Sequence, residues 1–142
     1  MDDLVADRLA LRYLAESYAA GCDRRDLSLL LPVFVESGTI TVHWHGREPG
    51  VMRAPDDLER IPKGLSRYDR TVHFIGNHFA DIRGDEASCR TYCFAHHITG
   101  TDDYVMSIIY EDECRRVDGA WKVVTRDLRL QWTEDRSVVV GS

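Results

Sequence analysis

The sequence has no long apolar run, no block of basic residues and no basic, hydrophobic leader. Without the roughly 18 apolar residues that span a bilayer, we expect no membrane segment. The start, Met1-Asp2-Asp3, is acidic and unlike a secretory signal, so we expect a cytoplasmic protein. The net charge of −6 predicts no nucleic-acid partner.

Cysteine is also scarce: the chain has four, and none form a CxxC pair. Cys89 and Cys93 stand in a predicted strand, where four residues span roughly 13 Å and no local disulfide can form. We therefore expect reduced, mostly buried thiols. A chain of 142 residues that is 44% hydrophobic can bury a core without disulfides or a metal, so we expect a single domain over residues 1–142.

Helical patterns dominate the first part of the chain. Apolar residues recur on one helical face from Leu4 to Cys22, which predicts a helix over about residues 3–20, stopped by Gly21. Asp26 is positioned to cap a second, short helix that Pro32 interrupts. A strand over Gly38–His45, a loop over Arg47–Pro55 and a weak helix over Pro55–Tyr68 are predicted to follow.

Long strands dominate the second part. Four are predicted, joined by Gly84-Asp85, Gly100-Thr101-Asp102 and Asp118-Gly119, which are hairpin turn signals. The strands are Thr71–Arg83, Glu86–Thr99, Asp103–Val117 and Ala120–Trp132. Helices followed by such a meander predict an α+β fold, a cone of helices packed on a strongly curved antiparallel sheet around a pocket.

Two of these strands place polar residues among apolar ones. His73 shares its side of the strand with Thr71, Ile75 and Asn77, a mixture typical of a pocket wall, while His78 is predicted on the other side. On the last strand Arg126 interrupts an apolar row, and a buried guanidinium needs an acid or an anionic ligand. Trp44 is a further candidate for the pocket lining, with Asn77.

The chain also resembles a known family. The resemblance rests on Tyr18 followed five residues later by Asp23, on Asp26, on the segment Thr71–Asn77 and on the turn Asp118–Val123. These resemble the SnoaL-like branch of the NTF2-like (cystatin-like) superfamily over residues 4–132. The chain is most similar to the group that contains scytalone dehydratase, bile-acid 7α-dehydratase and hexachlorocyclohexane dehydrochlorinase.

That resemblance implies a catalytic dyad of Asp23 and His73, with Tyr18 and Arg126 as substrate-binding residues. It implies no metal and no cofactor. A carboxylate that accepts from one imidazole nitrogen leaves the other free to abstract a proton and return it to a leaving group. The expected function is a lyase or isomerase acting on a small apolar, alicyclic or aromatic compound.

Other interpretations stay open at this point. Asp23 can cap a helix, His73 and Tyr18 can be core residues, and Arg126 can pair with an acid across the sheet. One of His96 and His97 can line the pocket, and the two face opposite ways. His43 and His45 with Glu48 approach a metal-binding pattern but supply an incomplete set. The alternative functions are a non-catalytic NTF2-like module that binds a ligand or a partner chain, and a polyketide cyclase-type enzyme.

The strand after Asp103 is apolar on both faces. Tyr104, Met106 and Ile108 occupy one face, and Val105 and Ile109 the other. A sheet with one face in solvent alternates more cleanly, so we expect a homodimer or homotrimer packed through the open face.

Overall fold

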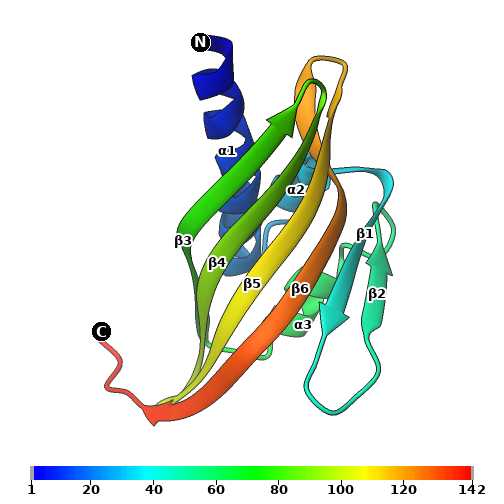
Figure 1. Cartoon of the computed structure of the whole chain (residues 1–142). Helices are drawn as coiled ribbons and strands as arrows, with labels where there is room; N and C mark the ends of the chain where they lie inside the picture. The colour runs from blue at the N-terminus through cyan, green and yellow to red at the C-terminus, as the bar shows by residue number, and fades with distance from the viewer. Residues whose placement is uncertain (1, 142) are drawn as a thin grey trace.

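The computed structural model describes residues 2–141, and side chains from residue 3 onward. Six strands form one curved sheet in the order β2-β1-β6-β5-β4-β3, with the helices on one side (Figure 1). The elements are α1 (Asp2–Arg24), α2 (Leu27–Leu30), the 3-10 turn η1 (Leu31–Val33), β1 (Phe34–His43), β2 (Gly50–Arg53), α3 (Arg60–Leu65), β3 (Arg70–Arg83), β4 (Glu86–Thr99), β5 (Asp102–Val117) and β6 (Ala120–Ser137). The predicted α+β, cystatin-like cone is confirmed.

Strands β3 to β6 form the predicted antiparallel meander, and β1 returns parallel to β6. The hairpin turns contain Gly84, Gly100, Asp118 and Gly119, all with positive φ, which glycine adopts without steric cost. One face of the meander packs on α1 and carries the core; the four cysteines are buried there and free, as expected. Within the described residues no helix is long and apolar enough to cross a membrane.

The first helix is longer than predicted. Gly21 does not end it: α1 continues to Arg24, and Arg25 adopts the left-handed conformation (φ 54°) just after it. Gly21 is instead the point where Leu30 packs on the helix, because a Cβ there would lie 2.7 Å from the Leu30 side chain. Asp23 therefore stands in the last turn of α1, while Asp26 caps α2 by accepting from the Ser28 backbone N–H.

The predicted loop over Arg47–Pro55 contains a short strand. Residues Gly50–Arg53 pair antiparallel with Thr39–Val42 as β2, at the edge of the sheet. Glycine and proline near its ends favour a loop in a sequence-based prediction, and a segment this short carries no strand pattern of its own. It is a strand because it pairs with β1.

The alternation along β3 is broken by a bulge. The register with β4 shifts between Ile75 and His78, so one extra residue lies in β3. Asn77, predicted to face inward with His73, is exposed, and half-buried His78 joins the inner side on which it was not predicted. The prediction for these two residues was wrong because an extra residue exchanges the two faces of a strand.

Candidate active site

Asp23 and His73 lie against each other. The Nδ1 of His73 is 2.7 Å from Oδ1 of Asp23. The backbone N–H of His73 donates to both carboxylate oxygens, at 3.1 and 2.9 Å. The His73 side chain is 7% exposed and that of Asp23 27%. Since the carboxylate only accepts, Nδ1 carries the proton and Nε2 is left for other partners.

A second layer holds the carboxylate in place. The Thr71 hydroxyl donates to Asp23 Oδ1 at 3.0 Å and accepts from the Arg25 guanidinium at 2.7 Å. The same Nη1 of Arg25 donates to the Cys22 carbonyl at the end of α1, at 2.7 Å. The left-handed turn after α1 and the start of β3 are thus tied together, so the dyad spans two elements that are far apart in sequence.

The electrostatic balance at Asp23 favours the charged form. Burial raises the pKa of Asp23, but hydrogen bonds from the His73 ring and backbone and from Thr71 more than offset it, so the pKa is lowered. Asp23 is therefore a carboxylate at neutral pH. Such an anion stabilises the imidazolium that forms when His73 takes up a proton.

His73 lines a cavity of about 460 Å³ on the inner side of the sheet, within the range of small-molecule sites. Its wall is mostly apolar and aromatic, with two imidazoles. It is lined by Tyr18, Cys22, Val42, Trp44, Arg47, Met52, Arg60, Ile61, Gly64, Leu65, Arg67, Tyr68, His73, His97, Tyr104, Met106, Ile108, Tyr110 and Leu128. The cavity brings together the predicted residues Tyr18, Trp44 and His73.

His97 is the second imidazole in this cavity, with its ring centroid 5.8 Å from that of His73. Its Nδ1 donates to the Tyr104 carbonyl at 2.9 Å, so Nε2 is the unprotonated nitrogen of the neutral ring. Burial, with help from nearby His73, lowers the pKa of His97. The ring is neutral at pH 7, and its Nε2 can accept a hydrogen bond.

Two tyrosines lie over the buried Arg126. Its guanidinium carbon is 4.5 Å from the ring centre of Tyr18 and 4.3 Å from that of Tyr110. Both tyrosines line the cavity, and burial raises the pKa of each well above 10, so both hydroxyls remain protonated donors.

Burial likewise raises the pKa of Cys22 and Cys93 to about 12, which leaves these thiols protonated and unreactive.

Arg126 itself does not line the cavity. Its Nε and Nη2 donate to the two oxygens of Asp112, each at 2.8 Å, in a pair that is almost completely buried. The alternative left open for Arg126, an acidic partner across the sheet, is thus the one that the structure shows, in place of the substrate role that the resemblance implied. Arg126 contributes to the site through the two tyrosine rings that it supports.

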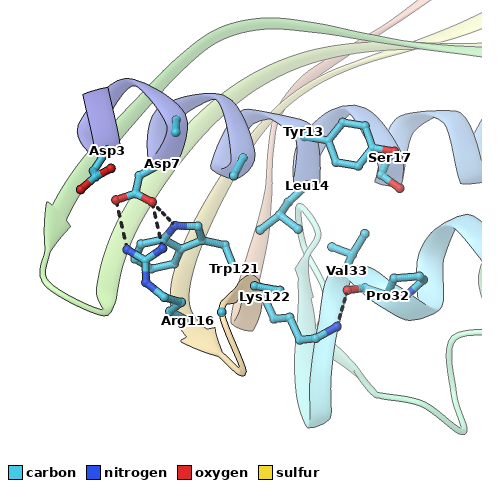
Figure 2. Close-up of a pocket in the computed structure, with 14 residues that line it drawn as sticks. Asp3, Asp7, Tyr13, Leu14, Ser17, Pro32, Val33, Arg116, Trp121 and Lys122 are labelled. Carbon is cyan, nitrogen blue, oxygen red and sulfur yellow. Dashed lines mark hydrogen bonds and ion pairs between the residues drawn. The ribbon is translucent and has the colours of Figure 1, made fainter. Parts of the chain in front are cut away.

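A larger hollow of about 710 Å³ lies elsewhere, between α1, the η1 turn and the β5–β6 hairpin. Figure 2 shows Asp7 in its wall, facing Arg116 and Trp121. The Asp7 carboxylate accepts hydrogen bonds from the Arg116 guanidinium at 2.9 and 3.1 Å and from the Trp121 indole N–H at 3.0 Å. These hydrogen bonds connect α1 to the β5–β6 hairpin and give the Asp7 carboxylate partners within the protein. None of the predicted site residues lines this hollow, so its size alone does not make it the candidate site.

The sequence matches the SnoaL-like domain family over residues 3–127. The chain belongs to the SnoaL-like family. No curated protein matches it.

Solved structures share the SnoaL-like fold of the chain. A hexachlorocyclohexane dehydrochlorinase from Novosphingobium barchaimii is 19% identical with a TM-score of 0.85, and the match covers 99% of this chain and 98% of that one. A Novosphingobium aromaticivorans protein, provisionally assigned as a scytalone dehydratase, is 24% identical with a TM-score of 0.81, over 98% and 94%. A protein from Kribbella flavida is 21% identical with a TM-score of 0.82, over 92% and 95%.

Sequence reasoning left His97 undecided and missed Tyr110, although a signal for His97 exists. The odd-numbered residues of β4 before it are small or weakly polar, and they are buried: Ala87, Cys89, Thr91, Cys93 and Ala95. Extending that alternation by one step puts His97 on the inner side. Tyr110 reads as an ordinary core residue, and only its position above Arg126 sets it apart.

Proposed function

We propose that this SnoaL-like protein is a lyase or isomerase that abstracts a proton from a small organic substrate and assists elimination. The observation that carries the proposal is the 2.7 Å contact of Asp23 with His73, whose ring lines a largely apolar cavity. Relatives of the same fold include proteins named as a dehydrochlorinase and, provisionally, a dehydratase.

Each side chain has a role in this proposal. His73 takes the proton at Nε2, and Asp23 holds the ring and stabilises the imidazolium. The hydroxyls of Tyr18 and Tyr110 donate to an oxygen of the substrate, where negative charge develops as the proton leaves. The imidazolium then returns its proton to the leaving group, so no net acid or base is consumed. Trp44 provides apolar surface for a ring.

The test is proton abstraction in heavy water. The protein is incubated with alicyclic and fused-ring ketones, half of which carry a β-hydroxyl group, and deuterium uptake and loss of water are followed by NMR. We expect uptake or elimination with at least one ring skeleton, and none with His73→Ala. Binding without either reaction across the set would favour the non-catalytic module.

A further inference from the structure

The cavity meets solvent at a rim made mostly of arginines. Four of its lining residues are exposed, and these are Arg47, Arg60, Gly64 and Arg67. They come from three separate segments: the loop before β2, helix α3 and the loop before β3. Among the described residues no aspartate or glutamate lines the cavity. The entrance is therefore cationic on a chain whose net charge is −6.

The three rim arginines have no acidic partner within 4.0 Å among the described residues, unlike Arg116 and Arg126. Three of the acids near them in sequence have other partners. Asp57 accepts from the Arg53 backbone N–H and Asp69 from that of Gly100. Glu59 pairs with Lys63 at 3.3 Å.

Two of these guanidinium groups are held by aromatic neighbours. The guanidinium carbon of Arg47 lies 4.5 Å from the ring centre of Trp44, and that of Arg67 lies 4.9 Å from the ring centre of Tyr68. Nη2 of Arg67 also donates to the Tyr68 hydroxyl at 2.8 Å. Stacking of this kind orients the planar group and leaves the remaining N–H donors free for an anion. Trp44 and Tyr68 line the cavity themselves, so the stacked arginines stand directly above its apolar wall.

From this arrangement we propose that the substrate carries an anionic group, which the rim arginines bind while its alicyclic or aromatic body fills the cavity. The inference rests on the proposed function only in placing the reacting carbon near His73. The family resemblance implied that Arg126 binds substrate, but Asp112 already neutralises this guanidinium. Carboxylate, sulfonate and phosphate share the chemistry that a guanidinium recognises.

Binding can be measured without knowing the reaction. Isothermal titration calorimetry compares 2-naphthylacetate with its uncharged amide, which keeps the ring and removes the charge. We expect the carboxylate to bind about tenfold more tightly than the amide, and added salt to weaken the binding of the carboxylate but not that of the amide. Naphthalene-2-sulfonate and 2-naphthyl phosphate, titrated in the same way, show which anionic group is preferred.

Substitutions locate the effect. Each of Arg47→Gln, Arg60→Gln and Arg67→Gln is expected to weaken carboxylate binding about two- to fivefold, and the triple variant about tenfold or more, with amide binding unchanged. Arg90→Gln is the matched control for each single variant. Arg90 is an exposed arginine of β4 that does not line the cavity, and its loss changes the net charge by the same amount as the loss of one rim arginine.

Equal affinity for the carboxylate and the amide would overturn the inference. So would a triple variant that binds the carboxylate as well as Arg90→Gln does. The calorimetry measures binding, so its result does not depend on whether the dyad is catalytic. If the heavy-water test finds no reaction, the protein can still bind the carboxylate more tightly than the amide. If the dyad is active but the carboxylate binds no better than the amide, the proposed function stands and the proposal of an anionic substrate group fails.

Discussion

Two Asp–His pairs of the molecule join the carboxylate to Nδ1 of the imidazole with nearly the same geometry but in different surroundings. A third pair, His43 with Asp127, uses Nε2 instead. In the inner pair, His73 Nδ1 is 2.7 Å from Asp23, and the ring faces a cavity. In the outer pair, His96 Nδ1 is 2.6 Å from Asp103 on the uncovered side of the sheet. His96 is 32% exposed and lines none of the hollows described above. Pair geometry is therefore common to both, and only an enclosed, apolar space makes one of them a candidate for catalysis.

The strongest test of this comparison is to remove each imidazole in turn. His73→Ala is expected to lower kcat/KM about 10²–10⁴-fold, the usual contribution of a positioned general base. His96→Ala is expected to leave the rate unchanged. Steady-state kinetics on a substrate found in the heavy-water screen measures both. Similar losses in the two variants would show that the cavity does not distinguish the pairs.

The buried pair behind the tyrosines is the next largest effect. Arg126→Leu leaves the Asp112 carboxylate buried without its partner, so we expect a loss of about 3–5 kcal/mol in the free energy of unfolding. The double variant Arg126→Leu/Asp112→Leu removes both charges and is expected to recover much of that loss. Urea denaturation measures each value. Unchanged stability in the single variant would mean that Arg126 has no structural role.

The carboxylate of the inner pair gives a third test. Asp23→Asn keeps the shape and an acceptor oxygen but can no longer stabilise the imidazolium, so we expect kcat to fall on the order of 10²-fold with the fold intact. Asp127→Asn, in the more exposed pair with His43, is the control and is expected to leave kcat unaltered, because neither residue lines the cavity. Circular dichroism checks folding. Full activity of Asp23→Asn would contradict the assigned role.

The inner and outer faces of the sheet also differ in what covers them. On the outer face Val72, Phe74, Phe94 and Trp132 are 45–65% exposed, and the rings of Phe94 and Trp132 lie 5.8 Å apart. We propose that a second or third copy of the chain covers this patch. Light scattering after size exclusion is expected to give a dimer or trimer, and Phe74→Ser to shift it toward monomer. A wild-type monomer at micromolar concentration would exclude this assembly.

The smallest expected effect concerns acid stability. The pKa of His97 is lowered in the folded protein, so the unfolded chain binds a proton more readily. The stabilisation from its neutral ring is complete above the unfolded value of about 6.5 and is lost as the pH falls from there toward the folded value. His97→Gln should therefore narrow the difference in Tm between pH 7.5 and 5. His96→Gln is the control, and an equal narrowing in both would contradict the assignment.

The sequence by itself determined the elements whose signals are local. The pairing of His73 with Asp23 was implied by the family resemblance, whereas alternation and turn residues predicted the four long strands. These signals succeed because strand periodicity and turn chemistry depend on neighbouring residues. They failed at Gly21 and Asn77, where packing against Leu30 and one extra residue in β3 reversed the local expectation.

The tertiary structure decided everything that depends on distant segments meeting. Arg126 lies opposite Asp112 because β5 and β6 pair in one register. The same register places the Tyr110 ring against the Arg126 guanidinium. The rim arginines come together from three segments that no sequence pattern links. Register, bulges and loop packing are set by the free energy of the whole core, so the chemistry of the entrance could be found only in the folded chain.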